Sequence, residues 1–96
     1  MVLLREVIGS QLRNTRKAQG ATLRDISTKA NVALGYLSEI ERGQKEPSSE
    51  LLSSICVALE ISVSTLMRAV TSEAARIENQ VRPIKTSRSN TNSKAA

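Results

Sequence analysis

The segment from Thr22 to Gly43 constrains the fold of this chain more than any other, because it specifies two short helices joined by a tight turn. Thr22 and Asp25 have the spacing at which a hydroxyl and a carboxylate cap the start of a helix. Asn31 lies between the two helices, and asparagine is one of the few non-glycine residues that tolerate the left-handed conformation a sharp turn needs. The segment therefore predicts helices over residues 23–30 and 33–42.

The second of these helices is slim on its outward side, where the chain places small or polar residues: Ala33, Gly35, Ser38 and Glu39. A short second helix set against a first is the geometry that enters the major groove of DNA, which is about 12 Å wide. The alternative is a helical hairpin that binds no ligand, and helical periodicity alone leaves both interpretations open.

The flanking sequence predicts three further helices, at residues 2–19, at 49–59, and from Ser62 to Pro83. In the first of them, Leu4, Ile8 and Leu12 recur at helical spacing and form the expected inward stripe. The chain has no Phe or Trp and only one Tyr, so its core must be aliphatic. Ninety-six residues suit a single domain, and the expected fold class is all-α.

Residues 8–66 resemble the Cro/C1-type helix–turn–helix family, the phage-repressor and xenobiotic-response-element (XRE) group of regulators. The matching residues are Ile8-Gly9, Leu12, Arg16, Gly20, all of 22–43, Pro47-Ser48, Ile55, Ala58-Leu59 and Ile61. The run LGYLSEIERG followed by KEPSSELL is similar to a narrower group, the actinobacterial activators of Clp protease genes.

The resemblance implies a five-helix, lambda-repressor-like DNA-binding domain over residues 1–66. An extended C-terminal dimerisation helix is expected over 67–83, and a disordered basic tail over 84–96. The family also pairs an arginine with a glutamate at the positions of Arg16 and Glu41, which implies a structural ion pair between the first and third helices.

The family's base-reading positions fall on five residues of this chain: Ala33, Leu34, Gly35, Ser38 and Glu39. A hydroxyl such as that of Ser38 can serve either base type, Glu39 can accept from a cytosine amino group, and Leu34 can touch a thymine methyl. These positions hold no Arg, Asn or Gln for a bidentate base contact. We therefore expect the shape of the DNA to carry part of the discrimination.

Phosphate contacts are expected from residues around the motif: Thr22, Leu23, Arg24, Tyr36, Arg42 and Lys45. The start of a helix is an anion site, so backbone amides near Thr22 are expected to contribute. Leu23 departs from the family, which usually has a polar residue there, often Gln, so one standard donor is missing. Tyr36 fits a phosphate contact and a half-buried ring equally well.

The last helix carries apolar residues at alternating steps of four and three, from Val63 through Met67, Val70, Ala74 and Ile77 to Val81. Such a narrow seam is typical of helices that pair with another helix. Packing back on the same chain is one interpretation. Pairing across a two-fold axis is the other, and it assigns dimerisation to Met67, Val70, Ala74, Ile77 and Val81.

The net charge of +5 suggests an anionic partner, but residues 82–96 supply most of it and the rest of the chain is nearly neutral. Nucleic-acid binding must therefore depend on local placement of charge. One cysteine and no histidine exclude a disulfide framework or a Cys/His zinc site within one chain, and no cofactor or enzymatic activity is expected. Cys56 fits a buried structural thiol better than a redox sensor.

These features favour a cytoplasmic transcriptional regulator that binds a near-palindromic operator as a homodimer, and the resemblance to the narrower group implies that it activates Clp protease and stress genes. No apolar run approaches the ~20 residues that span a membrane. RNA polymerase is a candidate partner, and so is a Clp protease that recognises the Ala95-Ala96 end, although an uninformative tail is the favoured interpretation of that end. The alternative function is a protein-interaction module, such as an antitoxin or a polymerase-associated factor.

Overall fold

The computed structural model describes residues 1–81, and within this range the chain forms five helices and no strand. They are α1 (Leu4–Ala18), α2 (Leu23–Ala30), α3 (Leu34–Glu41), α4 (Ser49–Ala58) and α5 (Val63–Val81). The all-α class and all five helices are confirmed, each beginning within two residues of its expected start. The expectations for the side chain of Val81 and for the tail, Ala95-Ala96 included, lie outside the described residues.

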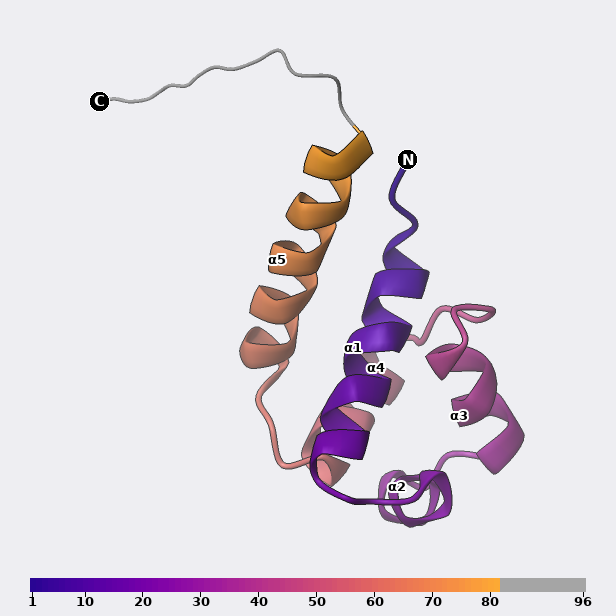
Figure 1. The fold of residues 1–96 in the computed structure, drawn as a ribbon. Helices are drawn as coiled ribbons and strands as arrows, with labels where there is room; N and C mark the ends of the chain where they lie inside the picture. The colour runs from indigo at the N-terminus through magenta and orange to yellow at the C-terminus, as the bar shows by residue number, and fades with distance from the viewer. Residues whose placement is uncertain (82–96) are drawn as a thin grey trace.

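The five helices are arranged around α1 (Figure 1). α5 packs along one side of α1 and α3 packs on another, while α2 contacts both α3 and α4. The α2–α3 pair therefore lies at the opposite side of α1 from α5, with α4 closing the core behind it.

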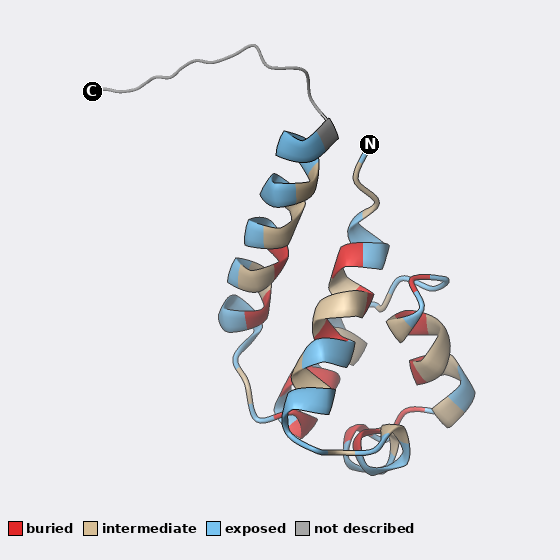
Figure 2. Ribbon diagram, in the orientation of Figure 1, coloured by how far each residue is buried: buried red, intermediate tan, exposed pale blue. Residues whose placement is uncertain are grey.

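The core is aliphatic, as expected, and draws on every helix (Figure 2). Its most deeply buried side chains are Leu12, Ile26, Leu37, Ile40, Ile55, Cys56, Leu59 and Leu66. Because Cys56 is one of them, the structural interpretation of this thiol is supported, and burial raises its pKa above the ordinary value.

The inward face of α1 differs from the expected one, because Leu4 is 55% exposed and Ile8 is only partly buried, whereas Val7, Gly9 and Leu12 are buried. The reason is a close approach of α1 to the end of α3. A Cβ atom built on Gly9 would lie 2.2 Å from the carbonyl oxygen of Ile40. The helix must turn its side-chain-free residue toward α3, and this rotation leaves Leu4 at the surface.

The local signals around α2 are confirmed in detail. The Asp25 amide donates to the Thr22 hydroxyl at 3.0 Å, and the Thr22 amide donates to the Asp25 carboxylate at 2.9 Å, which completes a reciprocal capping box. Asn31 adopts the left-handed conformation, with φ of 58°. Glu60 also has a positive φ, of 60°, at the end of α4, and no sequence signal indicated it.

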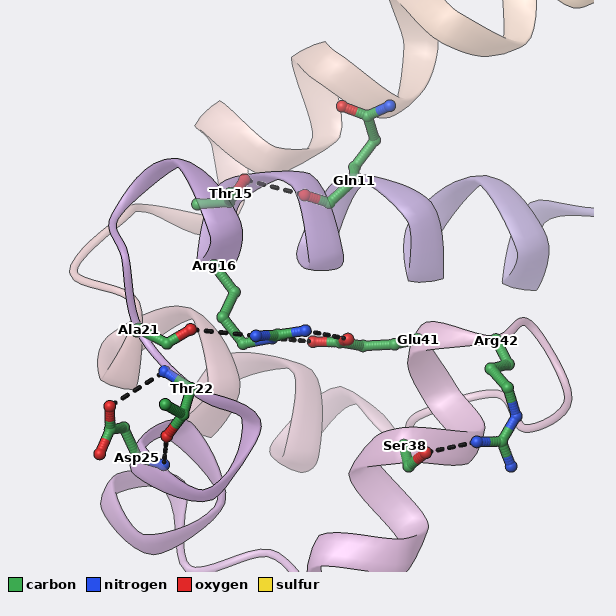
Figure 3. A network of polar contacts seen from close by, with 9 residues as sticks. All are labelled: Gln11, Thr15, Arg16, Ala21, Thr22, Asp25, Ser38, Glu41 and Arg42. Carbon is green, nitrogen blue, oxygen red and sulfur yellow. Dashed lines mark hydrogen bonds and ion pairs between the residues drawn. The ribbon is translucent and has the colours of Figure 1, made fainter.

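The expected ion pair joins α1 to α3 with two hydrogen bonds (Figure 3). Arg16 Nε and Nη2 donate to the two carboxylate oxygens of Glu41 at 2.8 and 3.0 Å, and Nη1 donates to the carbonyl of Ala21 at 3.0 Å. The two side chains are only 13% and 7% exposed. The hydrogen bonds with Glu41 raise the pKa of the Arg16 guanidinium, so the charge of Arg16 is secure at any pH at which the protein folds.

The apolar seam of α5 is partly used within the chain itself. Val70 is 4% exposed in the core, and Met67 and Ile77 pack against that core, whereas Val63 is 38% exposed. Intrachain packing thus accounts for the inner side of the seam, and dimerisation through α5 stays a prediction. Within residues 1–81 no single helix is long and apolar enough to cross a membrane; α4 and α5 satisfy length and composition only as a pair bent by 103°.

We expect Glu41→Gln to destabilise the protein by about 3 kcal/mol, because it leaves the mostly buried Arg16 charge without its carboxylate. The midpoint of urea unfolding measures this loss. Glu73→Gln is the matched control, since Glu73 pairs with Arg76 at the surface and its loss should change the midpoint little. Equal shifts for the two variants would contradict the structural role of the Arg16–Glu41 pair.

Asp25→Asn should weaken the fold at neutral pH and progressively less in acid. The backbone amide of Thr22, with a smaller contribution from the Thr22 side chain, holds the pKa of Asp25 below its ordinary value of 3.8. Because folding lowers this pKa, the carboxylate stabilises the protein at any pH above the pKa that Asp25 has in the unfolded chain. This contribution is lost as the pH falls through the pKa that Asp25 has in the folded protein. Urea midpoints of the two proteins should therefore converge below about pH 4. A gap independent of pH would rule out this role.

Candidate nucleic-acid interface

The five predicted base-reading residues share the outward face of α3, which we call the reading face: Ala33, Leu34, Gly35, Ser38 and Glu39. Ala33 and Gly35 are exposed, and the other three are partly buried. The opposite side of α3 is anchored by Leu37 and Ile40, which are fully buried. A Cβ atom built on Gly35 would meet nothing within 4 Å, so this face is open to a partner along its first turn.

Contacts at both ends of α3 hold the reading face in place. Before its start, the Ser27 hydroxyl donates to the carbonyl of Val32 at 2.6 Å, and the Val32 amide donates back to the carbonyl of Ser27 at 3.0 Å. At its end, Glu41 is bound by Arg16, and the backbone beside it contacts Gly9. α3 is thus fixed against α2 and α1 without using any residue of its reading face.

Arg42 lies beside the reading face, where it was expected only as a phosphate contact. Its guanidinium donates to the Ser38 hydroxyl through Nη1 (Figure 3). It also donates to Gln44 Oε1 at 3.3 Å through Nη2. The spacing of four residues between Ser38 and Arg42 was the signal that could have indicated this contact. Because the Ser38 oxygen accepts from Arg42, one of its two lone pairs is occupied.

The predicted phosphate-binding residues fall into two groups. Thr22, Arg24, Arg42 and Lys45 are exposed, whereas Leu23 and Tyr36 are partly buried and pack against the core. The burial of Tyr36 supports the half-buried ring, and its phosphate contact stays a prediction. Since Asp25 occupies the Thr22 amide, the helix-start donors left for a phosphate are the amides of Leu23 and Arg24, which bind no acceptor among the described residues.

A hollow of about 210 Å³ opens between α1, the start of α2, and α3. We call it the basic hollow, and its lining residues are Arg13, Arg16, Leu23, Ser38, Glu41 and Arg42. Three arginines and one glutamate give it a net positive charge. Arg13 was absent from the expected site residues, although it stands one helical turn before Arg16 and is exposed on α1.

Comparison with known proteins identifies the family of this chain. Residues 12–66 match the family model described as helix-turn-helix. The chain is 55% identical over 80 residues to the transcriptional regulator ClgR of Mycobacterium tuberculosis, covering 83% of this chain and 71% of that protein. It is also 40% identical over 62 residues to the HTH-type transcriptional regulator SinR of Bacillus subtilis, covering 64% of this chain and 56% of SinR.

Solved structures agree with this fold. The crystal structure of the clp gene regulator ClgR from Corynebacterium glutamicum matches with a TM-score of 0.79 and 46% identity, over 82% of this chain and 84% of that one. The restriction-modification controller protein C.Esp1396I, solved as a tetramer on its 35 base-pair operator, has a TM-score of 0.72 over 78% of this chain and 99% of that one; at 24% identity this likeness shows the fold alone. The chain belongs to the Cro/C1-type (XRE-type) helix-turn-helix family.

Proposed function

We propose that this protein is a sequence-specific DNA-binding transcriptional regulator of Clp protease genes, acting in the cytoplasm as a dimer on a near-palindromic operator. The observation that carries the proposal is the reading face, which is slim, is exposed at Ala33 and Gly35, and belongs to a helix held by Arg16–Glu41 and Ser27–Val32 contacts outside that face. The 55% identity to ClgR and the 46% identity to a solved clp gene regulator support the assignment of Clp protease genes as the regulated genes. Activation through contact with RNA polymerase is part of the proposal.

Base reading begins from the orientation of Ser38. Arg42 donates to its oxygen and occupies one of its two lone pairs, and we propose that Ser38 donates its own proton to an acceptor atom of a purine or to the O4 of thymine. Glu39 complements it, because a carboxylate accepts from that amino group. Leu34 adds an apolar surface for a thymine methyl. The reading face thus offers one donor, one acceptor and one apolar contact.

Phosphate binding orients the domain on the duplex without selecting a sequence. Arg24 and the free amides of the first turn of α2 lie on one side of the reading face, and Arg42 and Lys45 follow its end. Exposed cations on both sides of α3 fit the two backbones that border a major groove. This local placement lets a nearly neutral body bind DNA.

Dimerisation is proposed through the part of the α5 seam that the core of the same chain leaves uncovered, since Met67 and Ile77 are only partly buried. Met67 lies in an apolar surface groove with Ser64, Arg68, Thr71 and Ser72, and the exposed Val63 precedes it on the same seam. Ala74 and Ile77 continue the seam. Two reading faces related by a two-fold axis would meet half-sites about 34 Å apart, one turn of the duplex.

A protein-interaction module is the second candidate, favoured by the nearly neutral body and by the carboxylate of Glu39 on the reading face. Titrating the protein with duplex DNA at several salt concentrations separates the two functions. We expect the logarithm of affinity to fall steeply with the logarithm of salt concentration, because bound arginines and lysines displace counterions from the duplex. A flat profile would favour the protein-binding function.

Ser38→Ala and Lys45→Ala should weaken DNA binding in different ways. Loss of a direct base contact by Ser38 should cost about 1–3 kcal/mol at one base pair of the site. Loss of a phosphate contact by Lys45 should weaken all sequences alike and reduce the salt slope by about 1. Affinities for an operator selected from random DNA, and for its single-base variants, measure both. Identical profiles for the two variants would refute these roles.

Truncation after Val70 should convert the dimer into a monomer, as measured by light scattering. Because this truncation also removes Ile77 from its packing position, Met67→Lys provides a second variant that keeps α5 whole, and it should also be monomeric. Ala75→Lys, at an exposed position of α5 outside the seam, is the matched control. A dimeric mass for both interface variants would contradict the assignment.

A further inference from the structure

The basic hollow has a chemistry that the reading face lacks. Arg16 and Glu41, which form its floor, bind each other through both carboxylate oxygens and are nearly buried. Their charges cancel, and neither is free to bind a ligand. Among the six lining residues, Arg13 is exposed on α1, Arg42 is exposed and keeps donors beyond those that bind Ser38 and Gln44, and Leu23 adds an apolar side chain.

These groups select a small anion with several acceptor oxygens. Arg13 of α1 and Arg42, the residue that follows α3, both line the hollow, and Glu41, the acid in its lining, is already neutralised. Arginine forks match phosphate oxygens in geometry as well as charge. The volume of about 210 Å³ suits a phosphate group and the start of its sugar better than a whole nucleotide laid flat.

The position of the basic hollow identifies the source of that phosphate. It shares Ser38 with the reading face and Leu23 with the start of α2, so it lies at the edge of the surface proposed to meet DNA. Leu23 is also the position where the family resemblance expects a polar phosphate donor. A phosphate that passes this edge would meet an apolar side chain there and the guanidinium of Arg13 across the hollow.

We propose that Arg13, together with Arg42, binds one backbone phosphate of the operator in the basic hollow and supplies the contact that Leu23 cannot make. This inference rests on the proposed DNA-binding function. It adds a residue of α1, outside the helix–turn–helix, to the DNA-binding surface. Since α1 is held to α3 by Arg16, the new contact is fixed relative to the reading face.

The test compares Arg13→Gln with wild type on an operator duplex selected from random DNA, using fluorescence anisotropy at several salt concentrations. We expect weaker binding to the operator and to its single-base variants alike, with the salt slope less negative by about 1. Arg5→Gln is the matched control, because Arg5 is an exposed arginine of the same helix that does not line the basic hollow, and its slope should equal that of wild type. An Arg13→Gln protein with wild-type affinity and slope would overturn the inference. Absence of salt-dependent binding by wild type would instead overturn the proposed function.

A second variant tests the part played by Leu23. Adding Leu23→Gln to Arg13→Gln should restore much of the affinity through a neutral donor while the reduced salt slope remains, because an amide displaces no counterion. Failure to restore affinity would count against a shared phosphate. Inorganic phosphate titrated against the free protein separates the two sources of the anion. A saturable NMR shift of the Arg13 Nε proton would assign the hollow to a free phosphate ligand and overturn the backbone contact, and no shift supports it.

Discussion

The placement of α3 depends on one buried contact region, where the Arg16–Glu41 ion pair and the Gly9 approach join α1 to the end of α3. Arg16 also binds the carbonyl of Ala21, so a single guanidinium connects α1, the loop before α2, and α3. A buried charge pair is a weak source of net stability, but loss of one partner is costly because the other charge stays buried. The pair therefore acts chiefly to define one orientation of α3, and the reading face depends on that orientation.

The parts of the fold that depend only on residues close together along the chain were predictable from the sequence. The capping box at Thr22 and the left-handed Asn31 are local signals, and the structure confirms both. Leu4 was misassigned because the rotation of α1 is set by the contact of Gly9 with Ile40, which is distant in sequence. Helical periodicity indicates that a helix has an apolar side, but the exact orientation depends on what it packs against.

In the candidate site, the residue types could be predicted from the sequence, but the hydrogen-bond partners of their side chains could not. The reading face could be listed from the family positions, but the hydrogen bond from Arg42 to Ser38 restricts the hydroxyl in a way that a list of residue types does not reveal. The capping box similarly removes the Thr22 amide from the donors available to a phosphate. Arg13 escaped notice because it lies outside the motif, and only folding brings it beside Leu23 and Arg42. Function in a nearly neutral body thus depends on which polar groups are already occupied.

The continuity of α5 has a mechanical consequence. This helix begins inside the family match, buries Leu66 and Val70 in the core, and runs on along α1 to Val81. No loop separates the part that packs in the domain from the part that extends beyond it. A displacement of α5 near Ile77 would shift α1, against which α5 packs. α1 would in turn shift α3 through the bond from Arg16 to Glu41. In the proposed dimer, the spacing between the two copies and the tilt of each α3 would then change together.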